Sequence, residues 1–296
     1  MFSQQESQEM NGHRDGNLTR RQALGMGLGA LGAAALTSNA AAAEKKAKYK
    51  QGISVWCYRK KTMTMDEFCE EAKKIGFVSL DLLGPGEFPT LKKHGLVCSM
   101  VNTTGIPNGL NDPKNHEACV NKMREMIDAA AAEGYRNVIT FSGNRNGMDD
   151  ETGLKNSIEG AKKIAKYAEE KKVTVCLEYL NSINHKDYMA DRTRWNVDFV
   201  KGVGSERVKV LYDIYHAGMM KEDPIADIKK HYECWGHYHT GGVPGRHEID
   251  AKQTLDYPAI MKAIAETGFD GFVVHEYLPT RDWIEGLKEA YAICDV

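Results

Sequence analysis

The sequence has no Cys-x-x-Cys pair, no His-Glu-x-x-His motif and almost no excess charge of either sign. Its seven cysteines are an odd number at irregular spacing, which argues against a disulfide scaffold, and we expect most of them to be buried apolar side chains. A net charge of −2 implies no basic surface and therefore no nucleic-acid partner. The missing His-Glu-x-x-His pattern argues against a zinc protease.

The N-terminus has the composition of an export signal. Arg20 and Arg21 precede a Gly/Ala-rich apolar run at Ala23–Leu36, and small residues follow at 38–43. This order is typical of a twin-arginine signal peptide with an Ala-x-Ala cleavage site, here just before Glu44. The alternative interpretation is a disordered N-terminal tail.

We therefore expect residues 1–43 to be a cleaved signal peptide and the protein to be exported folded by the twin-arginine translocation machinery, to the periplasm or outside the cell. The signal contains a G-x-G-x-x-G pattern at Gly27–Gly32, but no strand precedes it, so it does not indicate NAD binding. Beyond it no apolar run approaches the ~20 residues that span a bilayer, and we expect no stable membrane anchor.

Residues 44–296 alternate between short β-branched apolar runs and amphipathic helical patterns. Several helical patterns end at a glycine just before the next strand, as at Gly76, Gly134 and Gly268, where a left-handed cap is expected. Eight alternations over about 250 residues favour an α/β fold, a single-domain (β/α)8 TIM barrel; a doubly wound open sheet is the alternative. The expected strands are 52–57, 78–83, 97–102, 137–141, 173–178, 208–213, 236–239 and 271–276, and expected helices include 66–74, 116–133, 153–171 and 257–266.

The last four expected strands each end in a side chain that binds metal ions well: Glu178, Asp213, His239 and Glu276. In a TIM barrel such strand ends form the active site, so the four should converge on one divalent metal. Three carboxylates and one imidazole favour Mn²⁺ or Mg²⁺, with Co²⁺ or Zn²⁺ as further candidates. The alternative for any single acidic member is a cap on the next helix. His237 lies one layer deeper and is expected to be a core histidine.

Two more polar residues are expected at the same end of the barrel. His216 follows the sixth strand, and Arg246 lies in a Gly/Pro loop after the seventh. A neutral imidazole and a guanidinium can bind hydroxyl, carbonyl or carboxylate oxygens of a small substrate. The alternative roles are a helix cap for His216 and a solvated loop charge for Arg246. Trp56 and Asn102, at the ends of the first and third strands, are further candidates for the pocket wall.

Four segments make the chain resemble the xylose-isomerase-like TIM barrels, among them most closely the hydroxypyruvate isomerases, with the ketose 3-epimerases as related enzymes. They are Leu177–Asn181, Tyr212–His216, Val243–Glu248 and His275–Pro279. The resemblance implies a metal held by Glu178, Asp213, His239 and Glu276, and substrate contacts from His216 and Arg246.

The same resemblance implies a reaction in which Glu178 and Glu276 transfer a proton next to a carbonyl group, through a metal-stabilised enediolate. Hydroxypyruvate isomerases usually have glutamine at the position of His239, whereas the related ketose 3-epimerases have histidine there. Export is a second departure, because hydroxypyruvate is a cytoplasmic metabolite. Both departures concern the substrate and leave the reaction class intact.

We therefore expect a metal-dependent isomerase of a small hydroxy-carbonyl compound, similar to hydroxypyruvate isomerase. A ketose 3-epimerase acting on a free sugar and a non-catalytic sugar-binding barrel are alternatives. A phosphodiesterase like the barrel endonucleases would need a three-metal cluster, and the first four strands end in none of the usual ligands. The first four strands end in Trp56, Leu83, Asn102 and Phe141. Assembly into a homo-oligomer is compatible with the sequence.

Overall fold

Eight parallel strands pair in chain order, and the last pairs with the first, so that the sheet closes into a barrel. This computed structural model describes residues 47–60 and 62–296, and the predicted signal peptide at 1–43 lies outside them. The predicted (β/α)8 barrel is confirmed. The strands are β1 (Lys50–Ser54), β2 (Ser79–Leu83), β3 (Val97–Val101), β4 (Asn137–Thr140), β5 (Thr174–Glu178), β6 (Val208–Asp213), β7 (Trp235–Thr240) and β8 (Phe272–His275).

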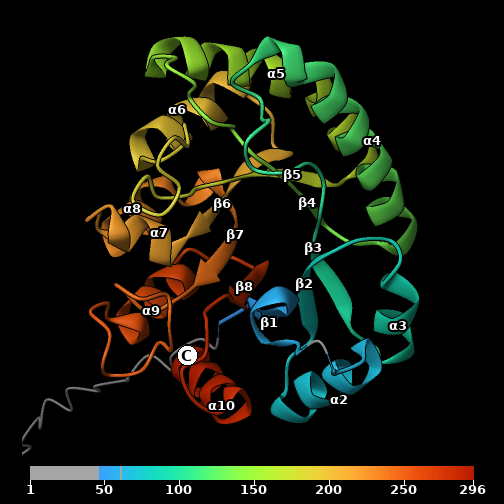
Figure 1. The fold of residues 1–296 in the computed structure, drawn as a ribbon, viewed down its shortest axis with the longest axis vertical. Coiled ribbons are helices and arrows are strands. Elements are labelled where there is room, and N and C mark those ends of the chain that lie inside the picture. Colours follow the sequence, from blue (N-terminus) through green and yellow to red (C-terminus); the bar gives the residue numbers. More distant parts are fainter. Residues whose placement is uncertain (1–46, 61) are drawn as a thin grey trace, which may run out of the picture. The chain divides into compact units, whose positions relative to one another are not determined.

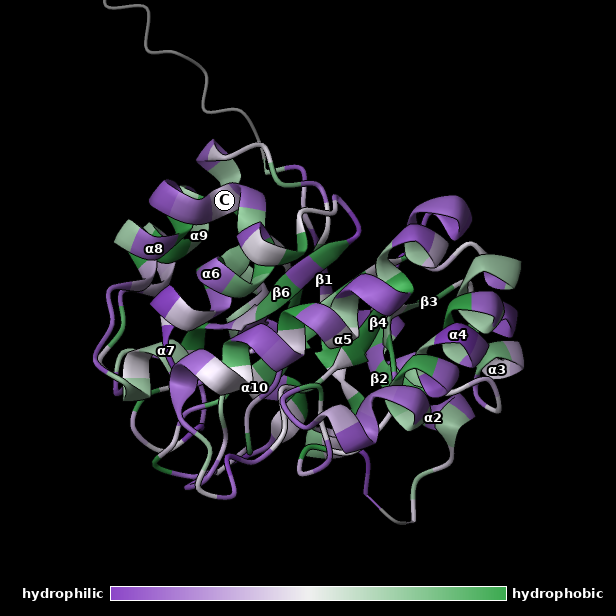
Figure 2. Ribbon diagram, turned by 90° about the horizontal axis from the view of Figure 1, so that it is seen from above, coloured by the Kyte–Doolittle hydropathy of each residue, from purple (hydrophilic) through white to green (hydrophobic). Residues whose placement is uncertain are grey.

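Helices surround the strands, and the long ones form the outer layer (Figure 1). Hydropathy follows the same division, with hydrophobic residues along the strands and hydrophilic residues over much of the helices (Figure 2). The helices are α1 (Val55–Tyr58), α2 (Met65–Ile75), α3 (Phe88–Lys93), η1 (Pro113–Asn115), α4 (His116–Glu133), α5 (Asp150–Lys171), α6 (Thr193–Val203), α7 (Ile214–Met219), α8 (Pro224–His231), η2 (Tyr232–Cys234), α9 (Tyr257–Glu266) and α10 (Trp283–Cys294).

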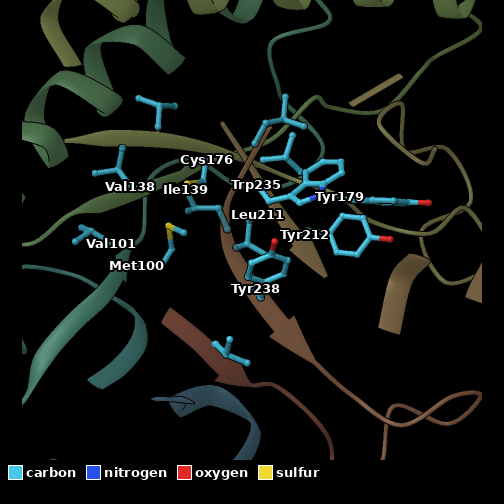
Figure 3. Close-up of a cluster of buried hydrophobic side chains, with 14 of the residues drawn as sticks. Met100, Val101, Val138, Ile139, Cys176, Tyr179, Leu211, Tyr212, Trp235 and Tyr238 are labelled. Carbon is cyan, nitrogen blue, oxygen red and sulfur yellow. The ribbon is translucent and has the colours of Figure 1, made fainter. Parts of the chain in front are cut away.

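Apolar side chains occupy much of the barrel interior below the polar strand ends. Met100, Ile139, Cys176 and Leu211 come from four successive strands, and each is at most 1% exposed. Figure 3 shows them gathered between the strands. Because side chains alternate along a strand, Cys176 and Leu211 lie on the same face as the residues that end β5 and β6. The apolar layer therefore supports the site from below.

Local sequence signals fix where helices begin and end. The Thr64 side chain accepts the backbone N–H of Glu67, whose side chain in turn accepts the N–H of Thr64, forming a capping box at the start of α2. Gly76 and Gly134 end α2 and α4 in the left-handed conformation, with φ of 117° and 72°. These two predicted glycine caps are confirmed, and each returns the chain to the next strand. At the end of α9 the cap is Thr267, and Gly268 follows it with a left-handed φ of 78°.

The first strand is shorter than predicted. The expected strand at 52–57 ends at Ser54, and the chain then turns into α1, where the Arg59 N–H donates to the Val55 carbonyl over 3.0 Å. Val55 and Tyr58, one helical turn apart, are both buried. The turn also changes the position of Trp56, which lies above the strand end rather than within the strand.

Six of the seven cysteines are buried, Cys57 is partly buried, and none is in a disulfide. This confirms their prediction as apolar fillers. Among the helices formed by the described residues, none combines the length and apolar character needed to cross a bilayer.

Candidate metal and active site

The four predicted ligands come together at the carboxyl end of the barrel. Glu178 and Asp213 end β5 and β6, His239 lies in β7, and Glu276 directly follows β8. Each contributes one ligand atom to a group in which all four atoms lie within 4.8 Å of one another. The sheet register aligns them, since Asp213 is the Cα partner of His239 across β6 and β7. All four side chains are buried.

A fifth buried residue, Asp81 in β2, fixes one of these ligands from across the barrel interior. Its Oδ2 lies 2.8 Å from Nε2 of His239 and 2.9 Å from Nε2 of His237. Ser99 donates to its other oxygen over 3.2 Å. Since a carboxylate only accepts hydrogen bonds, the Nε2 of His239 carries a proton, and in the neutral ring its Nδ1 offers a lone pair.

That lone pair faces the carboxylates. The Nδ1 of His239 lies 2.8 Å from Oε2 of Glu276, 3.8 Å from Oε1 of Glu178 and 3.9 Å from Oδ2 of Asp213. Within residues 47–60 and 62–296 it has no hydrogen-bond partner of acceptable geometry. A lone pair and carboxylates at these distances repel unless a positive charge lies on or between them. A positive charge is therefore expected here, either as a proton on Nδ1 or as a metal ion that the four side chains could hold.

The charge balance of the cluster supports the same conclusion. Burial and the charge of Glu276 raise the pKa of Glu178, and burial also raises that of Asp213. Burial alone would lower the pKa of His239, but the neighbouring carboxylates raise it well above its usual value. Buried like charges are stabilised by a shared cation. Three carboxylates and one imidazole, whose Nδ1 has no hydrogen-bond partner among the described residues, thus fit a divalent metal ion.

Arg246 supplies a positive charge at the edge of the cluster. Its Nη2 donates to Oδ2 of Asp213 over 2.9 Å and also donates to Oε2 of Glu276. The Arg246 Cζ lies 4.9 Å from the centre of the Tyr215 ring, and its backbone has a φ of +53°, which is uncommon for a residue other than glycine. The loop therefore holds the guanidinium over the carboxylates in a specific conformation.

His216 lies beside this guanidinium in a defined tautomer. Its Nδ1 accepts hydrogen bonds from the backbone N–H of Asn181 over 3.1 Å and from the Asn181 side-chain amide over 2.5 Å. The amide orientation is fixed, because its oxygen accepts the backbone N–H groups of residues 183 and 184. The proton of the neutral ring is therefore on Nε2, which lies 2.6 Å from Nη1 of Arg246. Burial keeps the pKa of His216 well below its usual value.

This contact places two donors opposite each other, the Nε2–H of His216 and an N–H of Arg246. Neither group can accept the other's hydrogen. The two nitrogens are too close for an oxygen atom to lie between them, but an oxygen beside the pair could accept from both donors. The pair is therefore suited to bind a hydroxyl, carbonyl or carboxylate oxygen, as the sequence predicts for these two residues.

The two glutamates have different surroundings. The Glu276 carboxylate accepts hydrogen bonds from Trp56 Nε1 over 2.7 Å and from Ser54 Oγ over 3.1 Å, in addition to Arg246. Burial alone would raise the pKa of Glu276, but His239, Arg246 and these donors lower it. Within the described part of the chain, no group donates a hydrogen bond to the Glu178 carboxylate. The pair thus combines a well-stabilised carboxylate with one that binds a proton more readily.

A pocket of about 450 Å³ opens above the cluster. Its two walls differ, because the residues from β5 to β8 are mostly polar and those from β1 to β4 are mostly apolar. Trp56 and Leu278 stand at the rim with 56% and 41% of their surface exposed. The polar wall includes Glu178, Asn184, His185, His216, Arg246 and Glu276, and the other wall includes Trp56, Leu82, Asn102, Ile106, Ile139 and Phe141.

The structure adds residues that the sequence did not single out. Asp81 has a sequence signal, since it is an acidic residue in the middle of the apolar strand Ser79–Leu83. Asn181 lies within one of the four segments that carry the resemblance, but its contact with His216 depends on the loop conformation. Trp56 was expected only as a wall residue, and its hydrogen bond to Glu276 depends on α1.

Comparison with known proteins shows which family and which relatives the chain resembles. The family described as "Xylose isomerase-like TIM barrel" matches residues 90–293. A 2-oxo-tetronate isomerase of Cupriavidus necator is 32% identical over 115 residues, 39% of this chain and 44% of that protein. A D-psicose 3-epimerase of Ruminiclostridium cellulolyticum is 33% identical over 133 residues, 44% of this chain and 43% of that protein. A Drosophila melanogaster protein provisionally named hydroxypyruvate isomerase is 33% identical over 85 residues, 29% of this chain and 32% of that protein.

The chain thus matches less than half the length of each of these three relatives. Among solved structures, a family 2 AP endonuclease from Brucella melitensis superposes with a TM-score of 0.72 at 24% identity, over 83% of this chain and 98% of that one. At this identity the likeness concerns the fold alone. The family match covers most of the barrel and agrees with the predicted resemblance, so the chain belongs to the xylose isomerase-like TIM barrel family.

Proposed function

We propose that this protein is a metal-dependent isomerase or epimerase that moves a proton next to the carbonyl group of a small hydroxy-carbonyl compound. The observation that carries the proposal is the group formed by Glu178, Asp213, His239 and Glu276, with ligand atoms within 4.8 Å of one another beneath the pocket. The relatives that are named isomerases and epimerases support the same reaction class.

These four residues would hold the ion, and Mn²⁺ or Mg²⁺ suits their oxygen-rich set best. When bound, the ion supplies positive charge that polarises the substrate carbonyl and favours loss of the neighbouring C–H proton. The Nε2–H of His216 and the guanidinium of Arg246 orient the substrate oxygens.

Glu178 and Glu276 carry the proton. One carboxylate takes the C–H proton, and the electron pair of that bond moves toward the carbonyl oxygen. In an isomerisation a proton returns to the former carbonyl carbon, while the hydroxyl proton moves to the former carbonyl oxygen. In an epimerisation the other carboxylate protonates the same carbon from the opposite face. Positioned acid–base groups of this kind contribute about 10²–10⁴-fold in rate.

The first candidate substrate is hydroxypyruvate or a similar small hydroxy-carbonyl acid, because the segments around the site resemble hydroxypyruvate isomerases. Arg246 could bind the carboxylate of such an acid. The second candidate is a free ketose undergoing 3-epimerisation. Two observations favour it: His239 at the third ligand position, and a 450 Å³ pocket with an apolar wall, which has room for more than three carbons.

One experiment tests both candidates. The purified protein is incubated with Mn²⁺ and either hydroxypyruvate or D-psicose in heavy water, and deuterium incorporation at carbon is followed by NMR. Incorporation with the acid supports the isomerase and incorporation at C3 of the ketose supports the epimerase. A protein that binds Mn²⁺ and exchanges neither substrate would favour the non-catalytic sugar-binding barrel instead.

The endonuclease alternative has little support from the site. The pocket wall formed by β1 to β4 and their loops contributes no histidine or acidic residue. Within the described residues, the two groups that could hold a metal share His239, and the Asp81 group is closed by direct hydrogen bonds. A three-metal cluster of the endonuclease type would need further ligands.

We also propose that residues 1–43 direct export through the twin-arginine route, which rests on the sequence pattern. Replacing Arg20 and Arg21 together by lysine should keep the precursor in the cytoplasm, measured by cell fractionation. The exported wild-type protein should begin at Glu44, measured by intact mass. Equal export of both proteins would contradict the proposal.

A further inference from the structure

The contact between Asp81 and the two histidines of β7 crosses the barrel interior. β2 and β7 are not neighbours in the sheet, so these side chains meet only through the space that the strands enclose. Asp81, His237 and His239 have no exposed surface. A buried carboxylate is expensive to maintain without donors, and this one accepts three, from both rings and from Ser99.

The donors fix the orientation of both rings. His239 can present Nδ1 to the carboxylates only while its Nε2–H remains bonded to Asp81. Flipping the ring about the Cβ–Cγ bond would exchange the positions of its nitrogen and carbon atoms and break the hydrogen bond to Asp81. His237 occupies the second position on the same carboxylate oxygen, 2.9 Å away, and thereby keeps Asp81 turned toward β7. Among the residues that the structure describes, its own Nδ1 has no partner, and its side-chain hydrogen bond is to Asp81.

We propose that Asp81 is a positioning residue for metal binding: it holds His239 as the Nε2–H tautomer, so that Nδ1 is the metal-binding atom, and His237 orients Asp81 for this purpose. The inference rests on the proposed metal site. It assigns a role to β2, in the half of the barrel that contributes no ligand. Metal-binding histidines characteristically donate their second N–H to such a partner, and losing it lowers metal affinity about 10–100-fold.

Two substitutions at Asp81 test the proposal. Asp81→Leu has a similar size and removes both acceptor oxygens, whereas Asp81→Asn keeps one. Mn²⁺ affinity of the chelator-treated protein is measured by titration calorimetry, and unfolding is followed separately by circular dichroism. Asp81→Leu should weaken Mn²⁺ binding by about 10–100-fold, and Asp81→Asn by less. A purely structural role would lower stability and leave the Mn²⁺ affinity of the folded protein unchanged.

Ser99→Ala is the matched control. It removes the donor to the other Asp81 oxygen and leaves both histidine contacts in place, so its Mn²⁺ affinity should stay within about twofold of wild type. Folded Asp81 variants that bind Mn²⁺ as tightly as wild type would overturn the proposal.

A measurement on the wild-type protein covers the case in which neither Asp81 variant folds. In the Mg²⁺-loaded protein with ¹⁵N-labelled histidine, long-range ¹H–¹⁵N spectra should show the His239 proton on Nε2. A proton on Nδ1 would overturn the proposal. The outcomes also separate it from the proposed function: wild-type protein that binds no divalent metal contradicts the metal site itself, whereas metal binding that is indifferent to Asp81 contradicts only the role of Asp81.

Discussion

The two halves of the barrel contribute different chemistry to the same pocket. Strands β5 to β8 and their loops carry the acidic and basic side chains, and β1 to β4 supply mostly apolar wall residues. Of the polar residues in the first half, Asn102 lines the pocket directly. The others act through the second half: Trp56 and Ser54 donate to Glu276, and Asp81 bonds to His239. On the proposed function, the β5 to β8 half (the reactive half) would carry out the reaction, and the β1 to β4 half (the supporting half) would support its side chains and limit the space available to the substrate.

The largest loss of activity should come from replacing Glu178 or Glu276, the glutamate pair of the reactive half. Glu178→Gln and Glu276→Gln each keep the side-chain size but remove the proton acceptor, so deuterium exchange should fall at least about 10²–10⁴-fold. Exchange is followed by NMR at saturating Mn²⁺. Glu285→Gln, on exposed α10 and 64% accessible in its side chain, is the control and should exchange like wild type. A glutamine variant that retains wild-type exchange would remove that glutamate from the reaction.

The next largest effect is expected at Arg246. Its Nη2 donates to Asp213, and its Nη1 lies beside the Nε2–H of His216, where the two donors would share a substrate oxygen; a lysine ammonium cannot occupy both positions. Losing one hydrogen bond to a charged group is worth roughly 1.5–3 kcal/mol, so Arg246→Lys should lower kcat/KM about 10- to 100-fold. Arg136→Lys, which pairs with Asp270 at the start of the strands, is the control. Equal kcat/KM for wild type and Arg246→Lys would contradict a role of the Arg246 guanidinium in substrate binding.

The clustering of the candidate ligands in the reactive half could be predicted from sequence because each lies at a strand end. Parallel strands of one barrel end at the same face, so Glu178, Asp213 and Glu276 had to lie close together once the strands were found. The eight strands themselves followed from alternating apolar runs and glycine caps. Their boundaries agreed to within one residue from β2 to β8, where the apolar runs end sharply.

The supporting half could not be predicted in the same way. The contact of Asp81 with His239 joins residues 158 positions apart, and no spacing rule relates β2 to β7. The hydrogen bond from Trp56 depends on a helical turn in a segment whose β-branched and aromatic residues predict a strand. Arg246 was found from its loop motif, but its contacts with Asp213 and Glu276 depend on a left-handed backbone conformation that composition does not specify.

A smaller effect is expected from the apolar wall. Phe141 lines the pocket but contacts no reacting group, so Phe141→Leu should change binding more than catalysis. A loss of about 1 kcal/mol, the lower end for a small change in an apolar pocket, corresponds to roughly a fivefold rise in KM with kcat retained. Steady-state kinetics on the substrate found by deuterium exchange measures both constants. A fall in kcat at unchanged KM would show that the supporting half takes part in the chemical step.

The smallest effect concerns the loop that holds Arg246. The buried Glu248 carboxylate accepts the Thr280 N–H and hydroxyl, each over 2.9 Å, and the Arg281 N–H over 3.3 Å, which ties this loop to the segment after β8. Burial alone would raise the pKa of Glu248, but these hydrogen bonds hold it below 4.5. The unfolded chain therefore binds more protons in acid than the native state does.

The stabilising contribution of Glu248 should thus be complete above pH 4.5, its ordinary pKa, and should be lost as the pH falls through the lower native value. Glu248→Gln should reduce the free energy of unfolding by about 1 kcal/mol at neutral pH, and the difference from wild type should shrink in acid. Urea unfolding between pH 3 and pH 7, followed by circular dichroism, measures this difference, with Glu285→Gln as the exposed control. A difference that grew toward low pH would contradict the role of Glu248 as an ionised acceptor. It would also contradict the view that the hydrogen bonds of Glu248 hold the Arg246 loop in place.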